Sequence, residues 1–263
     1  MNNKIVIEDF SFENFRSFKD FQTLNMTAAT RKSKDSELDI NNIYREEGEK
    51  AVLRSKIIYG ANASGKSNII KALKCYITLI TTCLQNKGVL SAIDPFEFSS
   101  KTENEPSFFQ LIFRNEGIRS RYGFVADRTK IHSEWLYLVP EAREVCIFER
   151  EDLKINNINN SRFAKGAEIA GLKNKLVNET TLFLSVADSF EDPLARKVVE
   201  LISSISILDE STRLNLLDND IATRLKNEED KSLIENLLKF ADIGINNLDL
   251  FKIPSKEEKD EDN

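Results

Sequence analysis

The stretch SKIIYGANASGKSNII, residues 55–70, decides the fold. It contains a short apolar run, a loop with two glycines, and the start of an apolar pattern that recurs every three or four residues as far as Leu84. The recurrence predicts a helix that begins near Lys66 and has Gly88 as its stop signal. The apolar run belongs to a predicted strand over 52–59. A strand, a glycine-containing loop and a helix, in that order, are what a phosphate-binding loop requires.

The loop itself, GANASGKS at residues 60–67, fits the pattern G-x-x-x-x-G-K-[ST]. Its two glycines keep side chains away from phosphates, so that successive N–H groups and the helix N-terminus face the anion. Lys66 would bridge the β- and γ-phosphates, and the Ser67 hydroxyl would ligate Mg²⁺. Asn62 either touches the γ-phosphate or holds the loop by a local hydrogen bond. The candidate ATP-binding residues are Gly60, Ala61, Asn62, Ala63, Ser64, Gly65, Lys66, Ser67 and Asn68. The competing interpretation is an ordinary glycine-rich turn.

The segments around this loop alternate between strand and helix patterns. Near-alternation of apolar residues predicts a strand over 5–15, a tight turn at Asn14 and a returning strand, FQTLNM. A meander of strands then follows, and it indicates an antiparallel subdomain. Later patterns predict a short strand TLFLSV and two helices, the first opened by Asp192-Pro193. The meander strands are FEFSS, SFFQLIFR, RYGFVA, KIHSEWLYL and REVCIFER, within residues 96–150, and the second helix carries Leu233, Ile234, Leu237, Leu238 and Ala241.

Composition excludes several classes of function. The chain has 37 basic and 43 acidic residues, a net charge of −6, which rules out a globally cationic nucleic-acid coat. Its one histidine, His132, excludes a multi-histidine metal site and argues against a Ser/His/Asp triad. Three cysteines without regular spacing fit a reducing cytosol, and no apolar run is long enough to cross a membrane. We therefore expect a soluble, cytoplasmic protein of one large or two small domains.

A catalytic acid for ATP hydrolysis would lie at the end of an apolar strand, and ISILDE at 205–210 has that form. In this interpretation Glu210 is catalytic. In the other, Ile205 and Leu208 continue the preceding helix and Asp209-Glu210 lie at its exposed end. The serines in the run and its three-and-four spacing favour the helix.

Taken together, the motifs resemble a known family. They are ENFRSFKDF, IIYGANASGKSNIIKAL, EWLY, FER, TLFLSVA and LLKFADIGINNLDL. This set is similar to bacterial ABC-type ATPases of the RecF/SMC/OLD-like branch, usually named AAA family ATP-binding proteins, which occur in restriction-associated and abortive-infection loci. The resemblance implies an α/β P-loop NTPase lobe with an attached antiparallel β subdomain and C-terminal helices. It divides the chain into an ATPase lobe at 1–150, a helical part at 151–254 and a disordered acidic tail at 255–263.

The resemblance also implies a function: an ATP- and Mg-binding ATPase in a DNA-related or antiphage system. Its expected partners are an identical chain or a C-terminal ATPase half, an effector or nuclease, and DNA. Arg16, in NFRSF, would reach the nucleotide or DNA, or else is a solvated turn arginine. The basic residues of the middle strands would contact DNA, or else form a solvated sheet face. These basic residues are Arg114, Arg119, Arg121, Arg128 and Lys130.

The chain departs from the family's pattern in its second half. The family's signature, Walker B strand and switch histidine follow the segment that matches ADIGINNLDL, and the signature's glycines are absent from LSVADSF. No glutamine follows Gln110 to serve as the Q-loop residue. One rival function is therefore a non-catalytic nucleotide-binding scaffold, and another is a small-molecule kinase. We also expect Leu237 and Phe251 to be partly uncovered where a second half or identical chain docks, unless they pack against the helix over 194–205.

Overall fold

The computed structural model describes residues 4–29, 36–46, 48–140, 143–172, 176–208, 222–240 and 247–249. Contacts divide the chain into two compact units, Met1–Ile207 and Leu208–Asn263. Each unit is described by itself.

The first unit is built on an antiparallel sheet whose strand order is β2-β1-β5-β6-β7-β8-β9. The predicted meander is confirmed for β5 to β8, but FEFSS is wrong because residues 97–101 form turns. The sequence prediction missed β9, whose two asparagines hide the strand pattern. The strands are β1 (Val6–Glu13), β2 (Gln22–Asn25), β5 (Ser107–Asn115), β6 (Ile118–Ala126), β7 (Ile131–Val139), β8 (Val145–Glu151) and β9 (Lys154–Ile158).

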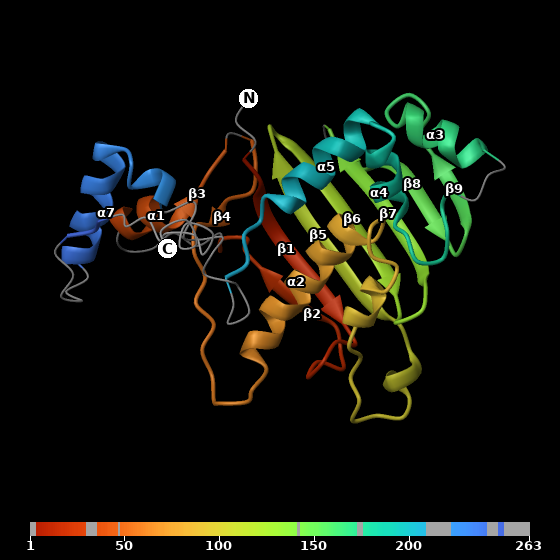
Figure 1. The fold of residues 1–263 in the computed structure, drawn as a ribbon, viewed down its shortest axis with the longest axis horizontal. Coiled ribbons are helices and arrows are strands. Elements are labelled where there is room, and N and C mark those ends of the chain that lie inside the picture. The colour runs from red at the N-terminus through yellow and green to blue at the C-terminus, as the bar shows by residue number, and fades with distance from the viewer. Residues whose placement is uncertain are drawn as a thin grey trace, which may run out of the picture. The chain divides into compact units, whose positions relative to one another are not determined.

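Helices cover one face of this sheet, as Figure 1 shows for α2 and α5. The predicted helix at the loop is confirmed as α2, and Asp192 caps α5 by accepting from the N–H groups of Leu194 and Ala195. A small hairpin, β3–β4, lies in the same unit. The bounds are α1 (Ser36–Asn42), β3 (Ile43–Tyr44), β4 (Val52–Leu53), α2 (Lys66–Thr82), α3 (Ala164–Gly171), α4 (Phe183–Ser189) and α5 (Pro193–Ser203), with short 3-10 turns at Val89–Ala92 and Thr102–Asn104.

The predicted strand TLFLSV is wrong, because residues Phe183–Ser189 form helix α4. Glu134 on β7 accepts hydrogen bonds from the first N–H groups of α4, those of Phe183 at 2.6 Å and Leu184 at 2.8 Å. Arg150 on β8 donates to the same carboxylate at 3.4 Å and to the Thr181 carbonyl at 2.5 Å. The sheet thus supplies hydrogen-bond partners for the free N–H groups at the start of α4. The apolar pattern of TLFLSV alone predicts a strand, because it contains no sign of these partners.

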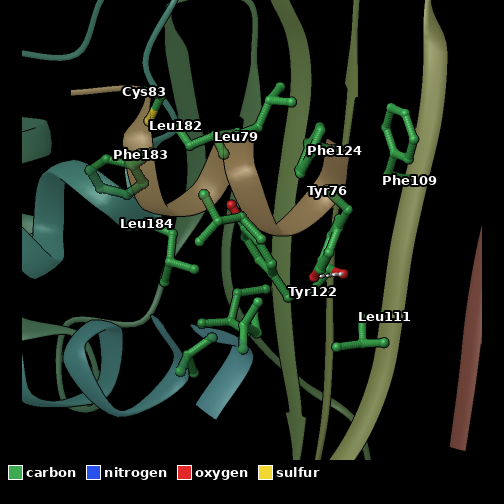
Figure 2. Close-up of a cluster of buried hydrophobic side chains, with 14 of the residues drawn as sticks. Tyr76, Leu79, Cys83, Phe109, Leu111, Tyr122, Phe124, Leu182, Phe183 and Leu184 are labelled. Atoms are coloured by element: carbon green, nitrogen blue, oxygen red, sulfur yellow. Dashed lines mark hydrogen bonds between the residues drawn. The ribbon is translucent and has the colours of Figure 1, made fainter. Parts of the chain in front are cut away.

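The core lies between α2 and the strands, as Figure 2 shows. Tyr76 and Leu79 of α2 are both fully buried, as are Phe109, Tyr122 and Phe124 of the facing strands. The Tyr76 hydroxyl donates to the Tyr122 carbonyl at 3.2 Å, and the Tyr122 hydroxyl donates to Glu134 at 3.0 Å. Each fully buried large apolar side chain contributes about 1.5–3 kcal/mol, so these contacts fix the position of α2 on the sheet.

The segment before the loop is the clearest departure from expectation. The strand predicted over 52–59 ends at Leu53, and residues 54–60 have no regular structure. Ile57 and Tyr59 are 85% and 90% exposed. A strand needs a neighbour for its backbone hydrogen bonds, and among the described strands none is paired with this segment.

The segment after α5 also differs from expectation. The helix ends at Ser203, so the interpretation that ISILDE continues it is wrong over its described part. Residues 205–208 are neither helix nor strand, and the partly buried Ile205 and Ile207 pack against the core. Asp209 and Glu210 lie outside the described residues.

The second unit contains the predicted last helix, α7 (Glu228–Phe240). No residue of α7 is buried, and Leu237 is 59% exposed, as expected. Ala241 and Phe251 lie outside the described residues. Within the described ranges of both units, no helix has the length and hydropathy that a membrane span needs.

Candidate functional site: the loop at the start of α2

The loop before α2 lies on the surface, with Gly60 to Ser64 exposed. Gly65 adopts the left-handed conformation with φ +91°, which glycine reaches without steric cost. A Cβ on Gly60 would lie 3.1 Å from Ser64 Oγ, so the loop also folds tightly on itself. The sequence places both glycines where the backbone needs them.

Lys66 occupies the mouth of this loop. Its Nζ donates to the carbonyl oxygens of Gly60 at 2.9 Å and Ala61 at 2.7 Å. The ammonium is therefore held at the loop by neutral acceptors, and no carboxylate of the described residues forms an ion pair with it, so its charge is available to an anion. Ser67 is exposed in the first turn of α2, where N–H groups have no partner within the helix.

A turn from the N-terminal hairpin packs against the loop. Asn68 Nδ2 donates to Ser17 Oγ at 2.9 Å. A Cβ on Gly65 would lie 2.6 Å from that same Ser17 Oγ and 3.1 Å from the Phe18 ring. NFRSF and GANASGKSN, far apart in the sequence, thus form one surface.

Asn14 anchors that turn to the rest of the unit. It is 3% exposed and has φ +52°, and its Nδ2 donates to the Thr102 and Glu105 carbonyls, both at 2.8 Å. Its Oδ1 accepts from the Phe96 N–H at 3.0 Å. Asparagine tolerates the left-handed region better than most residues, which suits it to this turn. Its side chain also satisfies the backbone hydrogen-bonding groups of the adjoining loop.

Arg16 points its charge at an aspartate. The backbone N–H of Arg16 donates to the Asp94 backbone carbonyl at 2.6 Å, and its guanidinium lies 3.6 Å from the Asp94 carboxylate. Arg128 binds the same carboxylate at 2.9 Å. Two guanidinium groups share one carboxylate beside the NFRSF turn, and the buried Nε of Arg16 has no hydrogen-bond partner in the part of the chain that the structure describes.

The other basic residues proposed to contact DNA are each paired with a carboxylate. Arg114, which is fully buried, and Arg119 both contact Glu8 at 2.7 Å. Arg121 contacts Glu144 and Lys130 contacts Asp152, each at 2.8 Å. Pairing neutralises these charges, so this set offers little net attraction for phosphates.

The remaining candidates for a second catalytic motif do not join the loop. Leu184 and Ser185, which begin the segment LSVADSF that was compared with the signature, are buried in α4, and Ser185 Oγ donates to the Ile80 carbonyl at 2.7 Å. A buried hydroxyl bound to a helix carbonyl is a packing contact. Glu210 lies outside the described residues. Among the side chains that the structure describes, no cluster of three His, Cys, Asp or Glu residues could hold a metal ion.

Sequence reasoning missed Ser17 and Asp94. Neither belongs to the G-x-x-x-x-G-K-[ST] pattern, and both reach the site through the tertiary fold. The only signal for Ser17 was its place in NFRSF.

One family model matches the chain over residues 57–262, and its description is "AAA domain, putative AbiEii toxin, Type IV TA system". No curated protein and no solved structure matches the chain.

Proposed function

We propose that this chain, which belongs to the AAA domain family of P-loop ATPases, binds ATP with Mg²⁺ through Gly60–Ser67. The observation that carries the proposal is the join of a tight glycine loop to the N-terminus of α2, with Lys66 held at the loop's mouth. N–H groups, an ammonium and hydroxyls form a donor set that suits a polyphosphate.

Each proposed contact has a defined role. Lys66 exchanges the Gly60 and Ala61 carbonyls for the β- and γ-phosphates. The exposed Ser67 hydroxyl would hold Mg²⁺, and the bound metal would neutralise phosphate charge. Asn62 and Asn68 add amide donors at the two ends of the loop. Arg16 can contribute by leaving Asp94, which Arg128 then keeps neutralised.

We further propose that the chain belongs to the RecF/SMC/OLD-like branch of ABC-type ATPases. The packing of the NFRSF turn on the phosphate loop supports this, because it joins the two most specific motifs of the resemblance. The AbiEii toxin description of the matching family favours a cytoplasmic role in a toxin–antitoxin or antiphage system. In that setting ATP would switch or drive an effector or nuclease. DNA is the weaker partner, because the expected basic residues are paired.

The exposed segment before the loop supports the proposal that a partner completes the site. Ile57 and Tyr59 are strongly exposed although they lie next to the phosphate loop. Leu237 and Phe240 of α7 are 59% and 91% exposed in the second unit. Exposed apolar residues of this kind favour docking of an identical chain or of a C-terminal ATPase half.

A non-catalytic scaffold is the second candidate. It is favoured by the burial of Leu184 and Ser185, since no signature is presented at the surface there. We therefore expect slow ATP hydrolysis by the purified chain. A turnover of several per second that Glu210→Gln abolishes would contradict the scaffold and make ISILDE a working Walker B segment.

Lys66→Ala tests ATP binding. We expect affinity for a fluorescent ATP analogue with Mg²⁺ to fall about tenfold to a hundredfold, because a charge-assisted contact to phosphate is lost. Thermal stability without nucleotide should stay unchanged, since the hydrogen bonds of Lys66 Nζ to described residues go to two exposed loop carbonyls. Lys71→Ala, an exposed lysine on the same helix, is the matched control. Equal affinities of wild type and Lys66→Ala would refute the phosphate role of Lys66.

A further inference from the structure

We propose that Ser17 is a positioning residue for the phosphate loop, an inference that rests on the proposed nucleotide binding. Its hydroxyl touches the loop in two places. It accepts the hydrogen bond from Asn68 Nδ2 at 2.9 Å, and it fills the space beside Gly65, where a Cβ would lie only 2.6 Å away.

These two contacts fix the part of the loop that faces the anion. Gly65 stands at φ +91° immediately before the first helical residue. Asn68 donates its N–H to the Gly65 carbonyl at 2.9 Å while its side chain donates to Ser17. Gly65 and Asn68 are thus bound to each other, Asn68 donates to the Ser17 hydroxyl, and Gly65 leaves no room for a side chain beside that hydroxyl. The backbone between them supplies the N–H groups of the helix start, so Ser17 determines where these groups point.

Ser17 can have this effect because several contacts hold its own turn in place. Phe15 and Phe18 exchange backbone hydrogen bonds, both at 2.9 Å, which closes the turn around Ser17. Asn14 hydrogen-bonds the turn to the loop that precedes β5. The Phe18 ring packs edge-on against the Phe12 ring, with 5.2 Å between the ring centroids. These contacts connect the Ser17 turn to the sheet and so determine where the hydroxyl lies.

The competing role is purely structural, with Ser17 helping to dock α2. The helix has a separate and much larger anchorage, because Tyr76 and Leu79 are fully buried against the sheet. Removal of one exposed hydroxyl should then leave global stability intact. A positioning role predicts weaker nucleotide binding without a loss of stability, and a docking role predicts the reverse.

The test compares wild type, Ser17→Ala, Ser17→Thr and the control Ser91→Ala in the full chain. Ser91 is a suitable control because its exposed hydroxyl bonds the Gly88 carbonyl in another turn. Three quantities are measured: affinity for a fluorescent ATP analogue with Mg²⁺, melting temperature without nucleotide, and amide hydrogen exchange of peptides covering 60–68 without nucleotide.

We expect Ser17→Ala to weaken binding about five- to tenfold, the effect of one lost hydrogen bond and the loosened loop. Its loop amides should exchange several-fold faster, while its melting temperature matches wild type. Ser17→Thr, which keeps the hydroxyl, should bind within about twofold of wild type, and Ser91→Ala should change nothing.

The inference is overturned if Ser17→Ala binds like wild type, if its melting temperature falls in proportion to the loss of affinity, or if Ser17→Thr is as weak as Ser17→Ala. Absence of ATP binding in wild type would instead remove the proposed function, and with it the nucleotide role of Ser17. The exchange measurement still separates the two failures. Unchanged amide exchange in Ser17→Ala would show that the Ser17 contact does not hold the loop, whether or not a nucleotide binds.

Discussion

The two ends of α2 are held in different ways. In its C-terminal half, Tyr76 and Leu79 are fully buried and face the sheet (Figure 2). At its N-terminus, the loop is exposed and is held by a few hydrogen bonds to a neighbouring turn and to itself. The buried half fixes the position of the helix, and the exposed end is accessible to the proposed nucleotide. Substitutions at the two ends should therefore separate stability from nucleotide affinity.

The largest effect is expected at Glu134, which joins the buried region to α4. Glu134→Ala leaves the Arg150 charge buried without its carboxylate and removes the acceptor for two helix N–H groups, so we expect a loss of about 3–5 kcal/mol in unfolding free energy. Urea denaturation measures it. Glu144→Ala, which breaks the more exposed pair with Arg121, is the control and should cost less than about 1 kcal/mol. Similar costs for both variants would show that the buried network does not stabilise the fold.

Leu79→Ala should come next, because it opens a cavity between α2 and the sheet. We expect a loss of about 2–5 kcal/mol in unfolding free energy, with the affinity of the folded protein for ATP analogue unchanged. Leu84→Ala, at a side chain that is 37% exposed, should cost about 0.5 kcal/mol or less. A strong loss of ATP affinity in folded Leu79→Ala would mean that the two ends of α2 are coupled.

Gly65→Ala should have the opposite profile, with a small cost in stability and a large one in binding. The alanine must adopt φ near +91°, and its methyl group must displace the Ser17 hydroxyl. The unfavourable backbone conformation alone costs about 1–2 kcal/mol. ATP affinity should fall at least tenfold in the titration used for Lys66→Ala, as the loop can no longer direct its N–H groups. Gly88→Ala is the matched control, since Gly88 has φ −87° and room for a Cβ. Full binding by Gly65→Ala would argue against a tight loop.

The effect that is smallest at neutral pH is a pH dependence from Cys75 on α2, which develops only in alkali. Burial raises the pKa of this thiol to about 12, whereas an unfolded cysteine titrates near about 8.5. A folded pKa above the unfolded value means that this contribution to stability is complete below about pH 8.5 and is lost as the pH rises toward 12. Urea midpoints between pH 8 and 10 should fall more steeply in wild type than in Cys75→Ala. Parallel slopes would contradict burial of the thiol.

Much of the fold could be predicted because local patterns matched the final environment. The alternation in β5 to β8 and the spacing in α2 and α5 agree with one buried face in each element. Predictions failed where a distant group decided the outcome. Phe183–Ser189 is helical with its first N–H groups bound to Glu134, and Ser55–Tyr59 lacks a strand partner among the described residues. Neither influence is visible in the local pattern.

The sequence by itself predicted the glycine loop at 60–67 and its proposed phosphate chemistry, because glycines, lysine and serine at fixed spacing before a helix carry that chemistry in the backbone and in their own side chains. Only the tertiary structure decided what holds that loop. The Ser17 contact, the Asn14 anchor, and the pairing of Arg114, Arg119 and Arg121 with carboxylates all join segments distant along the chain. Such contacts depend on which faces meet when the sheet forms, and a linear pattern does not contain that information.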